Sequence, residues 1–79
     1  MEKIKQKIEQ AVGFLKGISV QEPVNIQVEE TEQNGLVWRI VLSYYFGAET
    51  FYQKREYKEF HIADDEKEIR MTIFNPPNQ

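Results

Sequence analysis

The sequence predicts an α+β fold in which one N-terminal helix packs on one face of a four-stranded antiparallel meander sheet, in the order α-β-β-β-β. Two observations lead to this prediction. Apolar residues near the N-terminus recur with a helical period, and after Pro23 they recur with a period of two, as in strands with one buried face. Turn-forming residues divide the alternating part into four segments.

Length and composition indicate one small globular domain over residues 1–79. A chain of 79 residues has room for a single core. Its 41% hydrophobic and 29% charged residues are typical of folded rather than disordered chains. The chain contains no cysteine, which excludes disulfide bonds and thiolate metal sites.

The helix is predicted over residues 2–16. Apolar residues at i, i+4, i+7, i+8 and i+11 share one face: Ile4, Ile8, Ala11, Val12 and Leu15. The lysines of this segment are expected on the solvated face: Lys3, Lys5, Lys7 and Lys16. Gly17 is expected to end the helix as a C′ residue in the left-handed region.

The first two strands are predicted over residues 24–31 and 36–46, with their even-numbered side chains in the core. The apolar sets of both strands share a face only with a three-residue turn, Gln33-Asn34-Gly35, in which Gly35 forms a bulge. This register places Val28 opposite Ile40. It also places Glu29 opposite Arg39, as a cross-strand pair of opposite charge.

The last two strands are predicted over residues 55–63 and 68–74, after a loop at Gly47–Gln53. A short turn at the acidic stretch 64–67 is expected to place Ile62 opposite Ile69 and Phe60 opposite Met71. The prolines that follow residue 75 end the sheet. The predicted core consists of Ile4, Ile8, Val12, Leu15, Val24, Ile26, Val28, Trp38, Ile40, Leu42, Phe60, Ile62, Ile69, Met71 and Ile73.

One helix leaves the other sheet face uncovered, and this face is the predicted binding site. A plausible register of the second and third strands sets Val41 beside Tyr57 and Arg39 next to Glu59, and the last hairpin brings Phe74 to Tyr57. The expected apolar patch consists of Val41, Tyr45, Tyr57 and Phe74, with Arg39 at its edge. Exposed apolar patches often mark interaction sites.

The patch leads to a concrete expectation for partners. Two such faces can pack together in a homodimer, or one face can bind another protein. Tyr and Arg, both present in the patch, are favoured contact residues in protein interfaces. The substitution Val41→Glu is therefore expected to weaken association without unfolding the chain.

The stretch from Ser43 to Phe60 combines seven of the ten aromatic residues with Lys54, Arg55 and Lys58. Aromatic and basic residues together can bind single-stranded nucleic acid. However, the net charge is zero over residues 49–59 and −3 over the chain, whereas phosphate binding needs a basic surface. A nucleic-acid-associated protein is therefore only the third hypothesis.

Catalysis, cofactors and metal binding are not predicted. His61 is the single histidine, and no HExxH or Ser/His/Asp spacing accompanies it. The acidic stretch 64–68 lacks the alternating ligands of an EF-hand. Polar residues interrupt the N-terminal segment, and no apolar run approaches about 20 residues, so a cytoplasmic protein without a membrane span is expected.

Two motifs are similar to those of PepSY domains, a family of small α+β modules. Gly35, Trp38, Ile40 and Leu42 match its first strand motif; Tyr57, Phe60, Ile62, Asp64 and Ile69 match a later strand that runs into an acidic turn. The resemblance covers about residues 4–74 and implies a regulatory or inhibitory domain acting on a larger enzyme. The leading hypothesis remains a non-enzymatic protein-interaction module that acts through its open sheet face or as a homodimer, and the PepSY role is the alternative.

Overall fold

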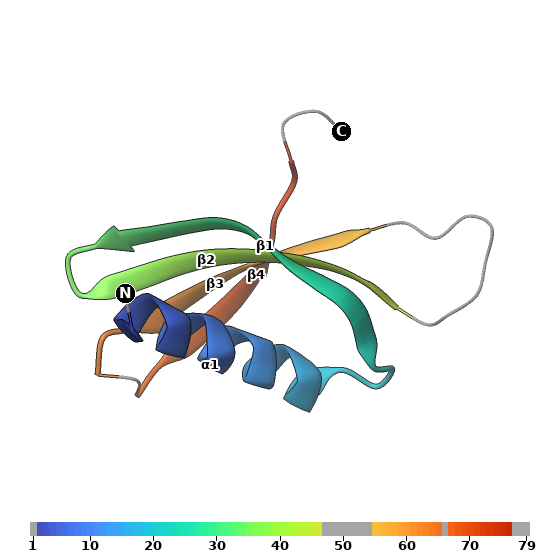
Figure 1. The fold of residues 1–79 in the computed structure, drawn as a ribbon, viewed down its shortest axis with the longest axis horizontal. Coiled ribbons are helices and arrows are strands. Elements are labelled where there is room, and N and C mark those ends of the chain that lie inside the picture. Colours follow the sequence, from blue (N-terminus) through green and yellow to red (C-terminus); the bar gives the residue numbers. More distant parts are fainter. Residues whose placement is uncertain (1, 47–54, 66, 77–79) are drawn as a thin grey trace.

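The structure, a computed structural model, describes residues 2–46, 55–65 and 67–76. It consists of α1 (Glu2–Ile18), β1 (Pro23–Asn34), β2 (Val37–Phe46), β3 (Glu56–Ala63) and β4 (Ile69–Ile73). The strands form one antiparallel sheet in the order β1-β2-β3-β4, and α1 lies across one of its faces (Figure 1). The predicted fold class is confirmed. The loop predicted at Gly47–Gln53 lies outside the described residues.

The core lies between α1 and the two central strands. Its buried residues are Ala11 and Leu15 of α1, Trp38, Ile40, Leu42 and Tyr44 of β2, and Phe60 and Ile62 of β3. Phe14, just off the apolar stripe, packs edge-on against Phe60 with ring centroids 6.2 Å apart. Three predicted core residues are instead exposed: Val24, Val28 and Ile73.

The end of α1 differs from the prediction. The helix continues to Ile18, and among the described glycines only Gly35 has a positive φ, so a left-handed cap at Gly17 was wrong. The Ser19 hydroxyl donates to the Leu15 carbonyl at 2.7 Å. This bond gives a last-turn carbonyl the partner that a C′ amide would otherwise provide.

Lys7 is buried although it was predicted on the solvated face of the helix. Its side chain is fully buried, and its Nζ donates to the carbonyls of Ala63 at 3.3 Å and Asp64 at 3.1 Å. Lys3 pairs with the Asp64 carboxylate at 3.4 Å, which also accepts from the Trp38 indole at 3.2 Å. The indole, and then Lys3, hold the pKa of Asp64 below its usual value. These contacts attach α1 to the β3–β4 turn.

The β1–β2 turn has two residues rather than three. Asn34 pairs with Val37, so Gly35 and Leu36 form the turn. Gly35 has a φ of 62°, and Leu36 is not among the residues with positive φ. Glycine with positive φ at the first of two loop positions is the arrangement of a type II′ turn. The predicted Gly35 bulge was therefore wrong.

The irregularity expected in the turn lies within β1 instead. The register shifts between Val24 and Gln27 and again between Val28 and Glu30, and each extra residue turns the following side chains to the other face. As a result Val28 pairs with Leu42 rather than Ile40. The pairing of Glu32 rather than Glu29 with Arg39 follows from the two-residue turn, because this pair lies between the turn and both shifts. Asn25, at the first shift, has a φ of 55°, and β1 bends markedly along its length (Figure 1).

Of the other two registers, that of β2 with β3 was predicted wrongly and that of β3 with β4 was predicted correctly. Val41 pairs with Glu59 and Arg39 with His61, so the predicted pairing of Val41 with Tyr57 was wrong by two residues, although the faces are unchanged. The predicted β3–β4 register is confirmed, with Ile62 opposite Ile69 and Phe60 opposite Met71.

Candidate functional site

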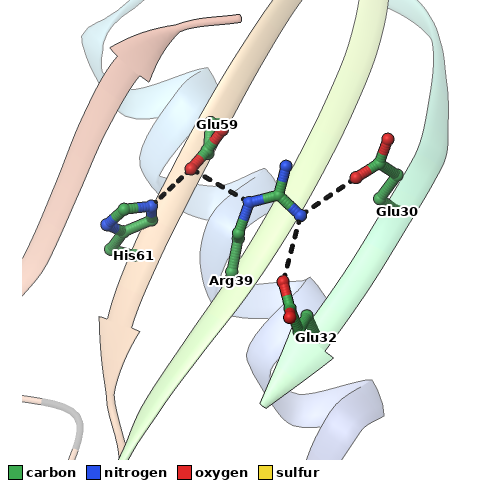
Figure 2. A network of polar contacts seen from close by, with 5 residues as sticks. All are labelled: Glu30, Glu32, Arg39, Glu59 and His61. Atoms are coloured by element: carbon green, nitrogen blue, oxygen red, sulfur yellow. Dashed lines mark hydrogen bonds and ion pairs between the residues drawn. The ribbon is translucent and has the colours of Figure 1, made fainter. Parts of the chain in front are cut away.

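The outer face of the sheet, the face turned away from α1, carries a polar cluster centred on Arg39. Its guanidinium donates to Glu30 at 2.9 Å, to Glu32 at 3.4 Å and to Glu59 at 3.0 Å, and Glu59 also lies 2.6 Å from His61 Nε2 (Figure 2). We call these five residues the Arg39 network. Because the acids come from β1 and β3 and Arg39 from β2, the network connects three strands.

The network keeps its central acid ionised. The hydrogen bond with His61, and then that with Arg39, lower the pKa of Glu59. Hydrogen bonds with Glu30 and then Glu59 raise the pKa of Arg39. An ionised carboxylate only accepts hydrogen bonds, so His61 Nε2 carries the hydrogen in this pair.

The lowered pKa of Glu59 predicts a loss of stability in acid. Its carboxylate contributes stability that is fully present above its ordinary pKa of 4.5 and disappears as the pH falls through the lower folded-state value. We expect Glu59→Gln to cost about 1 kcal/mol near neutral pH, and we expect this difference from the wild type to shrink as the pH falls below 4.5. Urea unfolding across this range is the measurement.

The matched control for this prediction is Glu68→Gln. Glu68 has an exposed side chain that lies 3.7 Å from Arg70, so its substitution should change the free energy of unfolding little. A Glu59→Gln variant whose stability falls with pH in parallel with the wild type would contradict the assigned role.

A second polar cluster, centred on Arg55, lies at the opposite end of the outer face. Arg55 donates through Nε to Ser43 Oγ at 2.7 Å and through Nη2 to the Asn25 carbonyl at 2.5 Å. Its guanidinium lies 4.7 Å from the centroid of the Tyr45 ring. Ser43 is fully buried and donates to Glu29 at 2.6 Å. Arg55 therefore ties β1 and β2 together from the segment that precedes β3.

The structure brings together three of the five predicted patch residues. The Tyr57 and Phe74 ring centroids are 6.4 Å apart, and Arg39 lies 5.8 Å from the centroid of the Phe74 ring. Tyr45 lies beneath Arg55 instead. Val41 has no exposed surface, so its predicted exposure was wrong. Many side chains of this face are bonded to one another in the two polar clusters. A binding role for the predicted patch residues stays a prediction.

A groove lined mainly by apolar side chains lies on the other side of the sheet. This groove, of about 440 Å³ at the C-terminal end of α1, is lined by Leu15, Ile18, Ser19, Val20, Gln21, Tyr44, Phe46, Lys58 and Met71. We call it the α1-end groove. Ile18 is 49%, Val20 103% and Phe46 38% exposed, so apolar side chains around it face water.

Among the described residues, Lys58 is the one charged side chain that lines the α1-end groove. It pairs across the sheet with Leu42, a core residue, and therefore points to the same side of the sheet as α1. Its Nζ lies 5.7 Å from the centroid of the Tyr44 ring and 3.6 Å from Glu56. Arg55 bonds across the outer face, so these two cations do not form one basic patch; Lys54 lies outside the described residues.

The sequence interpretation missed this groove, although one signal was present. Lys58 shares the parity of Phe60 and Ile62, which predicts that it faces α1 rather than solvent on the outer face. Ile18 and Val20, two apolar residues that the predicted core does not include, also follow the predicted helix. A lysine in an inward position, next to surplus apolar residues, indicates a part of the sheet that α1 does not cover.

Three further observations concern metals, membranes and relatives. Within residues 2–46, 55–65 and 67–76, no three acidic, histidine or cysteine side chains are placed to hold a metal ion. In the same ranges, no helix has the length and apolar character needed to span a bilayer. No protein-family model, curated protein or solved structure matches the chain. The PepSY resemblance thus stays a prediction.

Proposed function

We propose that this protein is a small binding module without catalytic chemistry of its own, and that it holds a protein partner in the α1-end groove. The exposed apolar surface around this groove is the observation that carries the proposal. Val20 is fully exposed and Ile18 is about half exposed, and contiguous apolar surface of this kind marks interaction sites.

The chemistry of the groove favours binding over catalysis. Acyl or phosphoryl transfer needs a nucleophile, a base and an anion-stabilising group within mutual reach. The Ser19 hydroxyl already donates to the Leu15 carbonyl, and Tyr44 is almost fully buried. The outer face is a weaker candidate because Arg39 and Arg55, at its two ends, are engaged within the chain.

A module of this kind acts by occupying or restraining its partner. The regulatory role that the PepSY resemblance implies is one form of this activity, with a larger enzyme as the partner. Self-association is another form, in which the groove receives a second copy of the chain. Both forms require the same apolar surface.

The proposal predicts that groove substitutions abolish partner binding and leave the fold intact. In the double variant Ile18→Ser/Val20→Ser, we expect capture of the partner from native cell extract to fall at least about tenfold, as for central interface residues. Both side chains are exposed, so the free energy of unfolding should change by less than about 1 kcal/mol. Quantitative mass spectrometry and sedimentation are the measurements.

Leu36→Ser is the matched control. Leu36 is an exposed apolar residue in the β1–β2 turn and does not line the groove, so it should retain the partner. Loss of a dimer in the double variant alone would identify a second copy as the partner. An unchanged set of captured proteins, with unchanged sedimentation, would overturn the proposal.

A further inference from the structure

We infer that the partner segment in the α1-end groove is apolar and carries a carboxylate, from an Asp or Glu side chain, that pairs with Lys58. This inference rests on the proposed function and adds the chemistry of the partner. It follows from the single charged side chain, Lys58, among the described residues that line a mostly apolar groove.

Lys58 is placed to select charge because it is largely buried but weakly paired. Its side chain is 17% exposed. Its one acidic contact in the described part of the chain is Glu56, at 3.6 Å, and Glu56 is 44% exposed. A long ion pair with a solvated acid contributes little. The ammonium group is thus available to a better acceptor while its methylene groups line the groove.

A segment that covers Lys58 binds more or less tightly according to its own charge. An uncharged apolar segment would remove water from the ammonium group without replacing its hydrogen bonds, which is costly. A cationic segment would add repulsion. A carboxylate brought to Lys58 compensates for the lost water, and such charge pairs across an interface set specificity.

The surrounding groups indicate where the carboxylate lies. The C-terminal end of α1 carries the negative end of the helix dipole, so an anion is less favourable beside Leu15 and Ile18 than beside β3. The partner's apolar side chains are therefore expected over Ile18, Val20 and Phe46, with the acid over Lys58.

The shape of the groove favours a protein segment over a small amphiphile. Small-molecule sites enclose about 70–90% of the ligand surface. Here Val20 is fully exposed, and Ile73, the cross-strand partner of Lys58, is 73% exposed. A site with such exposed edges leaves much of a small ligand in water, whereas a protein partner covers the edges as well.

A charge series of peptides tests the inference. The probes are three acetylated and amidated 12-residue peptides of leucine and alanine that differ only at two positions, which hold Glu, Gln or Lys. We expect the Glu peptide to bind at least about tenfold more tightly than the Gln peptide, and the Lys peptide to bind most weakly. Titrations followed by NMR locate the site through the amide signals of Ile18, Val20 and Phe46.

Variants of the protein identify the group that reads the charge. Lys58→Met should remove the preference for Glu over Gln while retaining apolar binding, and Lys58→Glu should reverse the preference toward the Lys peptide. Glu56→Gln should strengthen binding of the Glu peptide because it removes the internal competitor. Lys16→Met is the control and should keep the Glu preference.

The possible failures are distinguishable. Equal binding of the Glu and Gln peptides, unchanged by Lys58→Met, overturns the inference and leaves the proposed function standing. Failure of all three peptides to shift groove signals at millimolar concentration contradicts both. Tighter binding of octanoate than of the Glu peptide would assign the groove to small amphiphiles and overturn the choice of a protein segment.

Discussion

The Val41→Glu variant is expected to lose most or all of its stability. Val41 has no exposed surface, and its cross-strand partners on either side are Glu30 and Glu59. A third carboxylate at this position would be buried without a partner and beside two like charges, at a cost of at least about 3 kcal/mol. Natural domains of this length are stable by only about 4–12 kcal/mol.

Val37→Glu is the control for this prediction. Val37 lies on the same strand and the same face, two positions before Arg39, but is 42% exposed. Its substitution should cost less than about 1 kcal/mol. Urea unfolding followed by Trp38 fluorescence and circular dichroism compares the two variants. A Val41→Glu protein as stable as Val37→Glu would show that the outer face opens readily at Val41.

This expected result reverses the interpretation of Val41 from sequence alone. Alternation placed Val41 correctly on the face away from α1, but alternation does not report what lies above a side chain. Arg39 bonds both Glu30 and Glu59, the two acids that flank Val41. The side chains of the Arg39 network thus lie around Val41 on the outer face. They shield Val41 from water in the way that a second layer of secondary structure would. The arginine and the acids were visible in the sequence, but their convergence depended on the register.

The registers that were predicted wrongly share a physical cause. A strand pair that slips by two residues keeps every side chain on its face, so alternation could not distinguish Val41 opposite Tyr57 from Val41 opposite Glu59. In β1, a bulge in the turn and the observed shift between Val28 and Glu30 both place Val28 opposite a core residue of β2, and the sequence pattern supports either. The second shift then pairs Val24 with Tyr45, on the outer face. The β3–β4 register was predictable because its short connection leaves few alternatives.

The α1-end groove was hidden for a different reason. Its existence depends on where α1 ends relative to β2 and β3, which is a property of packing rather than of local pattern. The prediction ended the helix at residue 16 and assigned Phe60 and Ile62 to the core without their neighbour of equal parity, Lys58. Inward-facing charge was therefore the strongest available signal for a site, and it indicated the face that α1 covers only in part.

Lys7→Met is expected to destabilise the protein by about 1–3 kcal/mol. Methionine has a volume close to that of the lysine stem, so packing of the buried side chain is largely retained. The carbonyls of Ala63 and Asp64 lose the donor that reaches them at 3.3 Å and 3.1 Å. Because removing one partner leaves partly buried acceptors without their donor, the destabilisation should be greatest where α1 meets the β3–β4 turn.

Lys5→Met separates this effect from a general effect of charge. Lys5 is an exposed lysine on the same helix, so its substitution removes the same charge and should change the free energy of unfolding by less than about 0.5 kcal/mol. Hydrogen exchange adds a local measurement, since the Ala63 amide, which donates to Glu68 at 3.0 Å, should exchange faster in Lys7→Met alone. Equal stability and equal exchange in the two variants would contradict the claim that the hydrogen bonds of Lys7 stabilise the β3–β4 turn.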